Sequence, residues 1–282
     1  MKDLILFGDC RKTISTITEP VKMCVTSPPY YGLRDYGGED NQIGMEESPE
    51  KYVDQLVDVF RSVKEVLTDD GTLWLNIGDS YYNYRSDGNY PKQTVSKTRQ
   101  DLPTKTPVRG NKLEGYKSKD LIGIPWLLAF ALRKDGWYLR QDIIWNKPNP
   151  MPESVKDRCT KSHEYIFLLS KSKNYYFDVD AIKESTIDGK GLKRKRSVWT
   201  VNTKPYKAAH FAVYPPELIE PCIKAGSQKG DIILDPFMGS GTTGMVAKSL
   251  GRYYIGCELN ENYGKLIQNR VSEYTINLED FV

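Results

Sequence analysis

The sequence contains little histidine and few cysteines. Two histidines and five cysteines occur in 282 residues, and the cysteines lie far apart without a CxxC pair. This spacing indicates neither a disulfide framework nor a zinc site. His163 and His210 likewise have no companions at metal-ligand spacing. The chain is therefore expected to carry reduced thiols and no metal ion.

Long apolar runs are also absent. The first ten residues, MKDLILFGDC, contain a short apolar run that meets Asp9 too early for a secretory signal. No stretch approaches the length needed to span a membrane. With 39% hydrophobic and 27% charged residues, the composition is that of a globular protein. A cytoplasmic protein without a membrane partner is expected.

Basic charge is concentrated in two segments, although the net charge of the whole chain is only +3. Residues 84–119 contain nine Lys/Arg against three Asp/Glu, and residues 182–207 contain eight against two. Both segments are poor in apolar periodicity and rich in loop-forming residues, as inserted segments are. A single charge run is usually a solvated surface. Two of them in an otherwise acidic chain favour a polyanionic partner.

Strand and helix patterns alternate along the chain, which predicts a largely parallel α/β sheet. Strands are expected at residues 4–7, 21–26, 72–77, 137–145, 164–170, 231–234 and 253–257. Helices are expected at 49–67, from Pro125 to Gly136, after Pro216, at 242–250 and at 260–274, and residues 69–71 are expected to turn. The length fits a single catalytic domain, 1–282, with segments 84–119 and 182–207 as insertions.

A strand that runs into a glycine-rich turn and a helix lies at residues 231–250, DIILDPFMGSGTTGMVAKSL. Ligands of parallel sheets bind at the carboxyl ends of strands, where such a turn allows close backbone approach and the helix start offers free N–H groups. Gly239 and Gly241 occupy the turn, and Glu258 ends the next strand, where a carboxylate accepts hydrogen bonds from ribose hydroxyls. A nucleoside-containing ligand is expected. GSGTTG lacks the lysine of a P-loop and the third glycine of a dinucleotide site.

The segment VKMCVTSPPYYG, residues 21–32, ends a strand in two prolines. Each proline lacks a backbone donor and fixes its φ, so Ser27-Pro28-Pro29-Tyr30 is expected to form a rigid loop at the edge of the sheet. A base turned out of a duplex needs acceptors for its amino protons and a flat surface against its ring. The Ser27 hydroxyl and the Pro28 carbonyl can supply the acceptors, and Tyr30 the stacking face. Alone, the tetrapeptide would favour an ordinary Pro-Pro turn with a core tyrosine.

Together, SPPY and the later DPFMGSGTT resemble the N4-cytosine/N6-adenine DNA methyltransferase family, in the permuted order where the catalytic motif comes first. The resemblance extends over nearly the whole chain, through GDC at 8–10, DIIWNKPNP, HEYIFLLSKS and HFAVYPPELIEPCIKAGS. It implies a Rossmann-like, circularly permuted fold with a mostly parallel seven-stranded sheet, helices on both faces and S-adenosyl-L-methionine as cofactor. The two basic segments match the family least and are the expected target-recognition elements.

The resemblance also implies roles for individual residues. Asp9 would contact the cofactor adenine, Glu258 the ribose, and Asp235 with the backbone of 237–242 the methionine end. The expected cofactor residues are Asp9, Cys10, Phe211, Asp235, Phe237, Gly239, Ser240, Gly241, Thr242 and Glu258. The expected catalytic residues are Ser27, Pro28, Pro29 and Tyr30, and the expected DNA contacts are Lys193, Arg194, Lys195 and Arg196.

The expected reaction is direct methyl transfer to the exocyclic N4 of a flipped cytosine in double-stranded DNA. The family's N4-cytosine enzymes mostly carry Ser at the position of Ser27, whereas its adenine enzymes mostly carry Asp, so adenine N6 stays open as the alternative. An inactive nucleic-acid-binding homologue is a remoter alternative, which the intact SPPY and GxG elements oppose. Pro221-Cys222 is similar to the nucleophile of carbon-5 cytosine methylation, but Cys222 is expected to be a packing residue. A cognate restriction endonuclease is compatible with the family.

Overall fold

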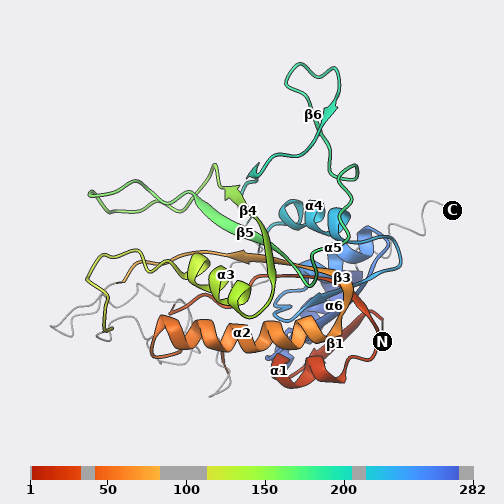
Figure 1. The fold of residues 1–282 in the computed structure, drawn as a ribbon, viewed down its shortest axis with the longest axis horizontal. Helices are drawn as coiled ribbons and strands as arrows, with labels where there is room; N and C mark the ends of the chain where they lie inside the picture. The colour runs from red at the N-terminus through yellow and green to blue at the C-terminus, as the bar shows by residue number, and fades with distance from the viewer. Residues whose placement is uncertain (1, 33–41, 83–112, 205–213, 273–282) are drawn as a thin grey trace.

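The computed structural model describes residues 2–32, 42–82, 113–204 and 214–272 (Figure 1). Within these residues, an eight-stranded sheet has the order β1-β10-β9-β2-β3-β5-β4-β8. Its strands are β1 (Leu4–Phe7), β2 (Val21–Thr26), β3 (Leu67–Ile77), β4 (Tyr138–Asn146), β5 (His163–Ser170), β8 (Val198–Thr200), β9 (Ile232–Asp235) and β10 (Tyr253–Glu258). Neighbouring strands are parallel except at β5, which is antiparallel to β3 and β4. Two further short strands, β6 (Glu184–Ser185) and β7 (Leu192–Lys193), pair as a hairpin.

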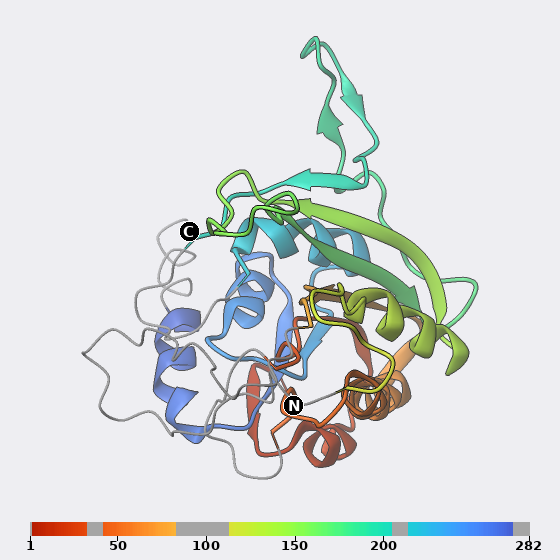
Figure 2. The same cartoon turned by 90° about the vertical axis from the view of Figure 1, so that its left-hand side faces the viewer.

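Helices cover both faces of the sheet (Figures 1 and 2). One face carries α1 (Cys10–Thr13), the 3₁₀ turn η1 (Ile14–Thr16), α2 (Pro49–Val66) and α3 (Ile124–Lys134); the other carries α4 (Pro216–Gly226), α5 (Thr242–Ser249), the 3₁₀ turn η3 (Glu261–Tyr263) and α6 (Gly264–Ser272). Side chains alternate between the two faces of a strand, so Leu73 and Leu75 pack under α2 and α3 while Trp74 packs under α4. The predicted α/β architecture is confirmed.

Local signals set the helix boundaries. The Ser48 hydroxyl accepts the Lys51 N–H at 3.3 Å and Pro49 opens α2, as the sequence predicts. Gly136, with φ +94°, follows α3 in the left-handed region that ends many helices.

Two elements differ from the sequence prediction. Residues 69–71 lie within β3 rather than between two elements, because α2 passes directly into β3. The pairing of β2 with β3 is irregular at this point, since Val21 pairs with Leu67 but Met23 pairs with Thr72. The sheet also has an eighth strand, β8, formed by the basic segment 182–207 and parallel to β4. Three residues are too few for a strand to be recognised from side-chain alternation.

Cys222 lies inside α4, fully buried, and its thiol points toward the Leu218 carbonyl at 3.7 Å. Burial raises the pKa of this thiol, which suits a packing residue rather than a nucleophile. All five cysteines are free thiols. Across the described ranges, no three His, Cys, Asp or Glu side chains gather to hold a metal ion. None of the helices described is long and apolar enough to cross a membrane.

Candidate active site

The carboxyl ends of four neighbouring parallel strands meet at one edge of the sheet. In the register of these strands, Phe7 lies beside Glu258 and Gly256 beside Asp235. β2 continues the series, because Cys24 pairs with Leu234 of β9. The segments that follow the strands therefore come together at the edge where parallel sheets bind ligands. This edge unites the two motifs, which lie near opposite ends of the chain.

The glycine turn between β9 and α5 has the backbone that the sequence predicts. Gly239 and Gly241 have φ of +52° and +86°, in the left-handed region that favours glycine. A Cβ at Gly241 would also lie 3.0 Å from Cγ2 of Ile267. At the start of α5, the buried Thr242 hydroxyl has no hydrogen-bond partner among the described residues. Together with the unsatisfied N–H groups of the first helical turn, this hydroxyl suits an anionic or hydroxyl-bearing ligand.

Glu258 closes the same turn from the neighbouring strand. One carboxylate oxygen accepts the Gly239 N–H at 2.8 Å and the other accepts the Asn260 N–H at 2.9 Å. Burial raises the pKa of Glu258 to about 7, although these backbone hydrogen bonds oppose the shift. Each oxygen keeps a lone pair that a ligand hydroxyl can use.

Asp235 is buried, and donors of the protein itself surround its carboxylate. It accepts the Thr26 hydroxyl at 2.6 Å, the Phe237 N–H at 3.0 Å, the Tyr214 hydroxyl at 3.1 Å and the Thr243 hydroxyl. Burial raises its pKa even so. The expected direct contacts of Asp235 and the Phe237 N–H with a ligand would require these hydrogen bonds to be exchanged. In this structure, the Asp235 carboxylate instead joins the glycine turn to Thr26 at the end of β2.

The remaining predicted cofactor residues differ in which of their groups a ligand could reach. Asp9 caps α1, accepts the Arg11 N–H at 3.0 Å and pairs with the Arg11 guanidinium at 2.6 Å. Cys10 is buried, and the buried Ser240 hydroxyl is bonded to Arg270. A ligand would therefore reach Cys10 and Ser240 through their backbone. Phe211 lies outside the described residues.

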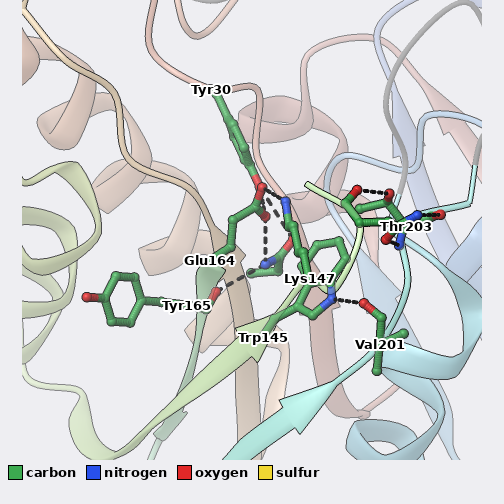
Figure 3. A network of polar contacts seen from close by, with 9 residues as sticks. Tyr30, Trp145, Lys147, Glu164, Tyr165, Val201 and Thr203 are labelled. Atoms are coloured by element: carbon green, nitrogen blue, oxygen red, sulfur yellow. Dashed lines mark hydrogen bonds and ion pairs between the residues drawn. The ribbon is translucent and has the colours of Figure 1, made fainter. Parts of the chain in front are cut away.

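The Ser27-Pro28-Pro29-Tyr30 loop follows β2 directly, as predicted. From α2, the Tyr52 hydroxyl donates to the Pro29 carbonyl at 2.8 Å. The ring of Tyr30 is half-buried, and its hydroxyl donates to Glu164 at 2.7 Å (Figure 3). Burial and the nearby Glu164 carboxylate raise the pKa of Tyr30, so the phenol stays neutral.

Three further residues complete this site, and the sequence reasoning did not identify them. The Lys147 ammonium, just beyond β4, pairs with Glu164 of β5 (Figure 3). The Asn76 amide of β3 donates to Glu164 at 3.3 Å and to the Tyr165 carbonyl at 3.1 Å. They come together because β5 runs antiparallel to both β3 and β4, a pairing that no local sequence pattern reveals.

Residues 182–197 form an arm that stands away from the sheet (Figures 1 and 2). Its hairpin of β6 and β7 carries Ile187 at the tip, 92% exposed. At the base of the arm, Trp199 of β8 is buried and stacks on Trp74. Since β8 pairs with the end of β4, the arm is attached at the same edge as the SPPY loop.

The four predicted DNA-contact residues in the arm fall into two pairs. Lys193 and Lys195 are half-buried and lie 3.5 and 3.9 Å from the carboxylate of Glu184. Arg194 and Arg196 are exposed. The alternation is that of an extended strand, in which successive side chains point to opposite sides. Of the other basic segment, 84–119, only residues 113–119 are described.

A glycine turn with an acidic residue at the end of the next strand, beside a proline-fixed serine loop, defines an α/β methyltransferase of the amino-group type. The N6/N4 methyltransferase family model, described as DNA methylase, matches residues 21–269. The type II methyltransferase M.Cfr9I of Citrobacter freundii is 52% identical over 262 residues, which are 92% of this chain and 83% of that protein. The chain therefore belongs to the N6/N4 DNA methylase family, whose members are S-adenosylmethionine-dependent DNA methyltransferases.

Solved structures show the same fold. The PvuII DNA methyltransferase (cytosine-N4-specific) superposes with a TM-score of 0.68 at 18% identity, covering 96% of this chain and 89% of that one. The complex of M1.HpyAVI with SAM superposes with a TM-score of 0.59 at 18% identity, covering 95% and 98%.

Proposed function

We propose that this chain transfers a methyl group to the exocyclic N4 of a cytosine turned out of duplex DNA. The observation that carries the proposal is the attachment of the SPPY loop to the cofactor turn, since Thr26, which precedes Ser27, bonds Asp235 at 2.6 Å. Serine at position 27 is what the family's N4-cytosine members mostly carry. The PvuII enzyme of the same fold is named as cytosine-N4-specific, which agrees with this choice.

The residues at the sheet edge fit S-adenosylmethionine. Glu258 would accept the ribose hydroxyls, and the loop that begins at Asp9 would border the adenine. The N–H groups at the start of α5 and the Thr242 hydroxyl, which has no partner among the described residues, would hold the methionine carboxylate. When bound, the cofactor supplies a methyl group activated by its sulfonium. Asp235 supports this pocket by fixing the turn.

Ser27, Pro28 and Tyr30 would prepare the base. The amino nitrogen of cytosine is a poor nucleophile because its lone pair is delocalised into the ring. The Ser27 hydroxyl and the Pro28 carbonyl accept its N–H groups, which localises the lone pair and aims it. The Tyr30 ring stacks on the base. Ser27 is too weak a base to remove a proton beforehand, so the proton leaves after methyl transfer.

Cofactor affinity should rise with pH, because ionised Glu258 is the better acceptor for ribose hydroxyls. With a pKa of about 7, its ionised fraction grows as the solution passes through neutrality. Glu258→Gln should bind the cofactor more weakly above neutral pH and lose most of this pH dependence. Calorimetric titration of the native protein and the variant with S-adenosylmethionine, below and above neutral pH, measures these affinities. An unchanged affinity in the variant would remove Glu258 from the pocket.

The same carboxyl should influence stability in the absence of cofactor. Its pKa is raised from 4.5 to about 7, so the stability that it contributes below pH 4.5 is lost as the pH rises through 7. Glu258→Gln should therefore melt at a higher temperature than the native protein above pH 7, and at a similar temperature near pH 4.5. If Glu258→Gln and the native protein melted at the same temperature both below and above neutral pH, the raised pKa assigned to Glu258 would be wrong.

The basic segments 84–119 and 182–207 are proposed as the target-recognition elements. The arm reaches out from the edge that holds the SPPY loop, so a duplex that lies along this edge could contact the arm and the loop together. We assign phosphate contacts to the exposed Arg194 and Arg196, and a supporting role to the half-buried Lys193 and Lys195. Because M.Cfr9I is named a type II methyltransferase, a cognate restriction endonuclease is part of the proposal.

The proposed function is tested in the DNA of an expression host that lacks N4-methylcytosine. Nucleosides from that DNA are separated and identified by mass spectrometry, with Ser27→Ala expressed at the same level as the control. N4-methylcytosine should accumulate with the native protein and be strongly reduced with the variant. N6-methyladenine alone would move the activity to adenine, and unmodified DNA beside methylated RNA would refute a DNA substrate.

A further inference from the structure

Arg270 of α6 contacts the glycine turn that is assigned to the methionine end of the cofactor. We propose that Arg270 is a positioning residue for the carboxylate of that end, because it holds the turn and places a positive charge beside it. The inference rests on the proposed function, since it takes over the placement of the methionine carboxylate at the start of α5. It adds a full charge to a site that would otherwise attract an anion through dipoles alone.

The guanidinium of Arg270 is buried inside the protein. Arg270 is 5% exposed, and it donates a hydrogen bond to the hydroxyl of Ser240, which is 2% exposed and belongs to the turn. Arginine keeps its proton in proteins, so the charge persists in this environment. The hydrogen bond to Ser240 therefore places a permanent positive charge in contact with the turn.

The packing of α6 against the turn fixes this position. Ile267, which precedes Arg270 by three residues, is fully buried. A Cβ at Gly241 would lie 3.0 Å from Cγ2 and 3.3 Å from Cα of Ile267, so α6 packs directly against the glycine backbone. Residues three apart on a helix share one face, so Ile267 and Arg270 reach the same turn.

The start of α5 offers donors to a ligand at the same place. Thr242 is 3% exposed, and its hydroxyl has no hydrogen-bond partner among the described residues. The N–H groups of the first helical turn have no acceptor within the helix, and the helix dipole makes this end positive. Ser240, which Arg270 holds, precedes Thr242 by two residues. The donors, the dipole and the buried cation therefore favour the same kind of group, an anion.

S-adenosylmethionine has one anionic group, the carboxylate of its methionine end. A buried cation attracts such a group more strongly than a cation in water does, because the effective dielectric constant is lower. The sulfonium is itself positive and gains nothing from Arg270, and the adenine and the ribose are uncharged. Arg270 should therefore strengthen the recognition of the carboxylate and of no other part of the cofactor.

Decarboxylated S-adenosylmethionine isolates this contribution, because it lacks only the carboxylate. Both ligands are titrated calorimetrically into the native protein, Arg270→Gln and Arg270→Lys. Arg270→Gln keeps a donor for Ser240 without the charge, so it should bind S-adenosylmethionine about tenfold more weakly and the decarboxylated ligand no more weakly than the native protein does. Arg270→Lys keeps the charge and should retain most of the preference for the carboxylate.

Arg252→Gln is the matched control. Arg252 also donates to a serine hydroxyl, that of Ser227 at 3.2 Å, but it lies immediately before β10, at the opposite end of that strand from Glu258. The affinities of both ligands should stay native in this variant. Should Arg270→Gln fail to fold, Ser240→Ala detaches the guanidinium from the turn and should lower the same preference.

A native preference for the carboxylate in Arg270→Gln, or an equal loss of affinity for both ligands, would overturn the inference. Thr242→Val tests the placement on which it depends, and it should weaken the binding of S-adenosylmethionine more than that of the decarboxylated ligand. An unchanged preference in Thr242→Val would place the carboxylate elsewhere and overturn the role of Arg270 with it. Neither result affects the methyl transfer assigned to Ser27, which the nucleoside analysis tests separately.

Discussion

Ser27→Ala is expected to slow single-turnover methyl transfer by about 5- to 150-fold, which corresponds to roughly 1–3 kcal/mol for one hydrogen bond that matters most in the transition state. The loss should fall on the rate constant, because the acceptor is needed most as the amino nitrogen becomes pyramidal. Cofactor affinity should stay close to native, since Ser27 is assigned to the base. Enzyme in excess over unmodified DNA, with methyl-labelled cofactor, gives this rate directly.

Tyr30→Ala is expected to differ in kind from Ser27→Ala. It removes a stacking surface worth about 1–3 kcal/mol per base, so it should weaken the binding of a flipped or mismatched base as well as turnover. Fluorescence of a base analogue that brightens on unstacking reports the first effect. If Tyr30→Ala held the flipped base as tightly as the native protein, the stacking role would be wrong. Native turnover in Ser27→Ala would contradict the proposed mechanism.

Replacing Arg194 and Arg196 together with glutamine is expected to weaken DNA binding on the order of tenfold or more at low salt. Each lost phosphate contact removes about one unit from the slope of log affinity against log salt concentration. The slope should therefore become shallower by about two units. Binding of a labelled duplex measured over a series of salt concentrations checks both quantities.

The matched control is the pair of lysines that alternates with these arginines. Lys193 and Lys195 lie against Glu184, so their replacement with glutamine removes equal charge but fewer exposed contacts. It should change the salt slope less than the arginine pair does. Equal effects of the two pairs would mean that the arm acts through its net charge alone, and an unaltered slope in both would make it a solvated loop.

The sequence predicted the elements whose causes are local. Two prolines end β2 and place Ser27 at the sheet edge, because proline cannot continue a central strand. Ser48 and Pro49 start α2 where capping rules place them. The glycine turn is equally local, since Gly239 and Gly241 adopt a backbone that other residues rarely adopt.

Features that depend on long-range packing could not be predicted in this way. Asp235 is predicted to contact the cofactor, and only the three-dimensional structure shows that the Thr26 and Tyr214 hydroxyls donate to its carboxylate. Glu164 and Lys147 meet only because β5 runs antiparallel to β4, a pairing that no local pattern reveals. The position of Glu184 in three dimensions likewise decides which basic side chains of the arm lie against a carboxylate and which face solvent.

The position of the transferred methyl group is the most direct test of the central claim. Purified protein is incubated with unmodified duplex DNA and S-adenosylmethionine carrying a carbon-13 methyl group, and the digested nucleosides are resolved by mass spectrometry. The heavy methyl group should be found on N4 of deoxycytidine, and Ser27→Ala should sharply slow its appearance. A heavy methyl group on N6 of deoxyadenosine, or none in DNA from an enzyme that binds its cofactor, would contradict the account.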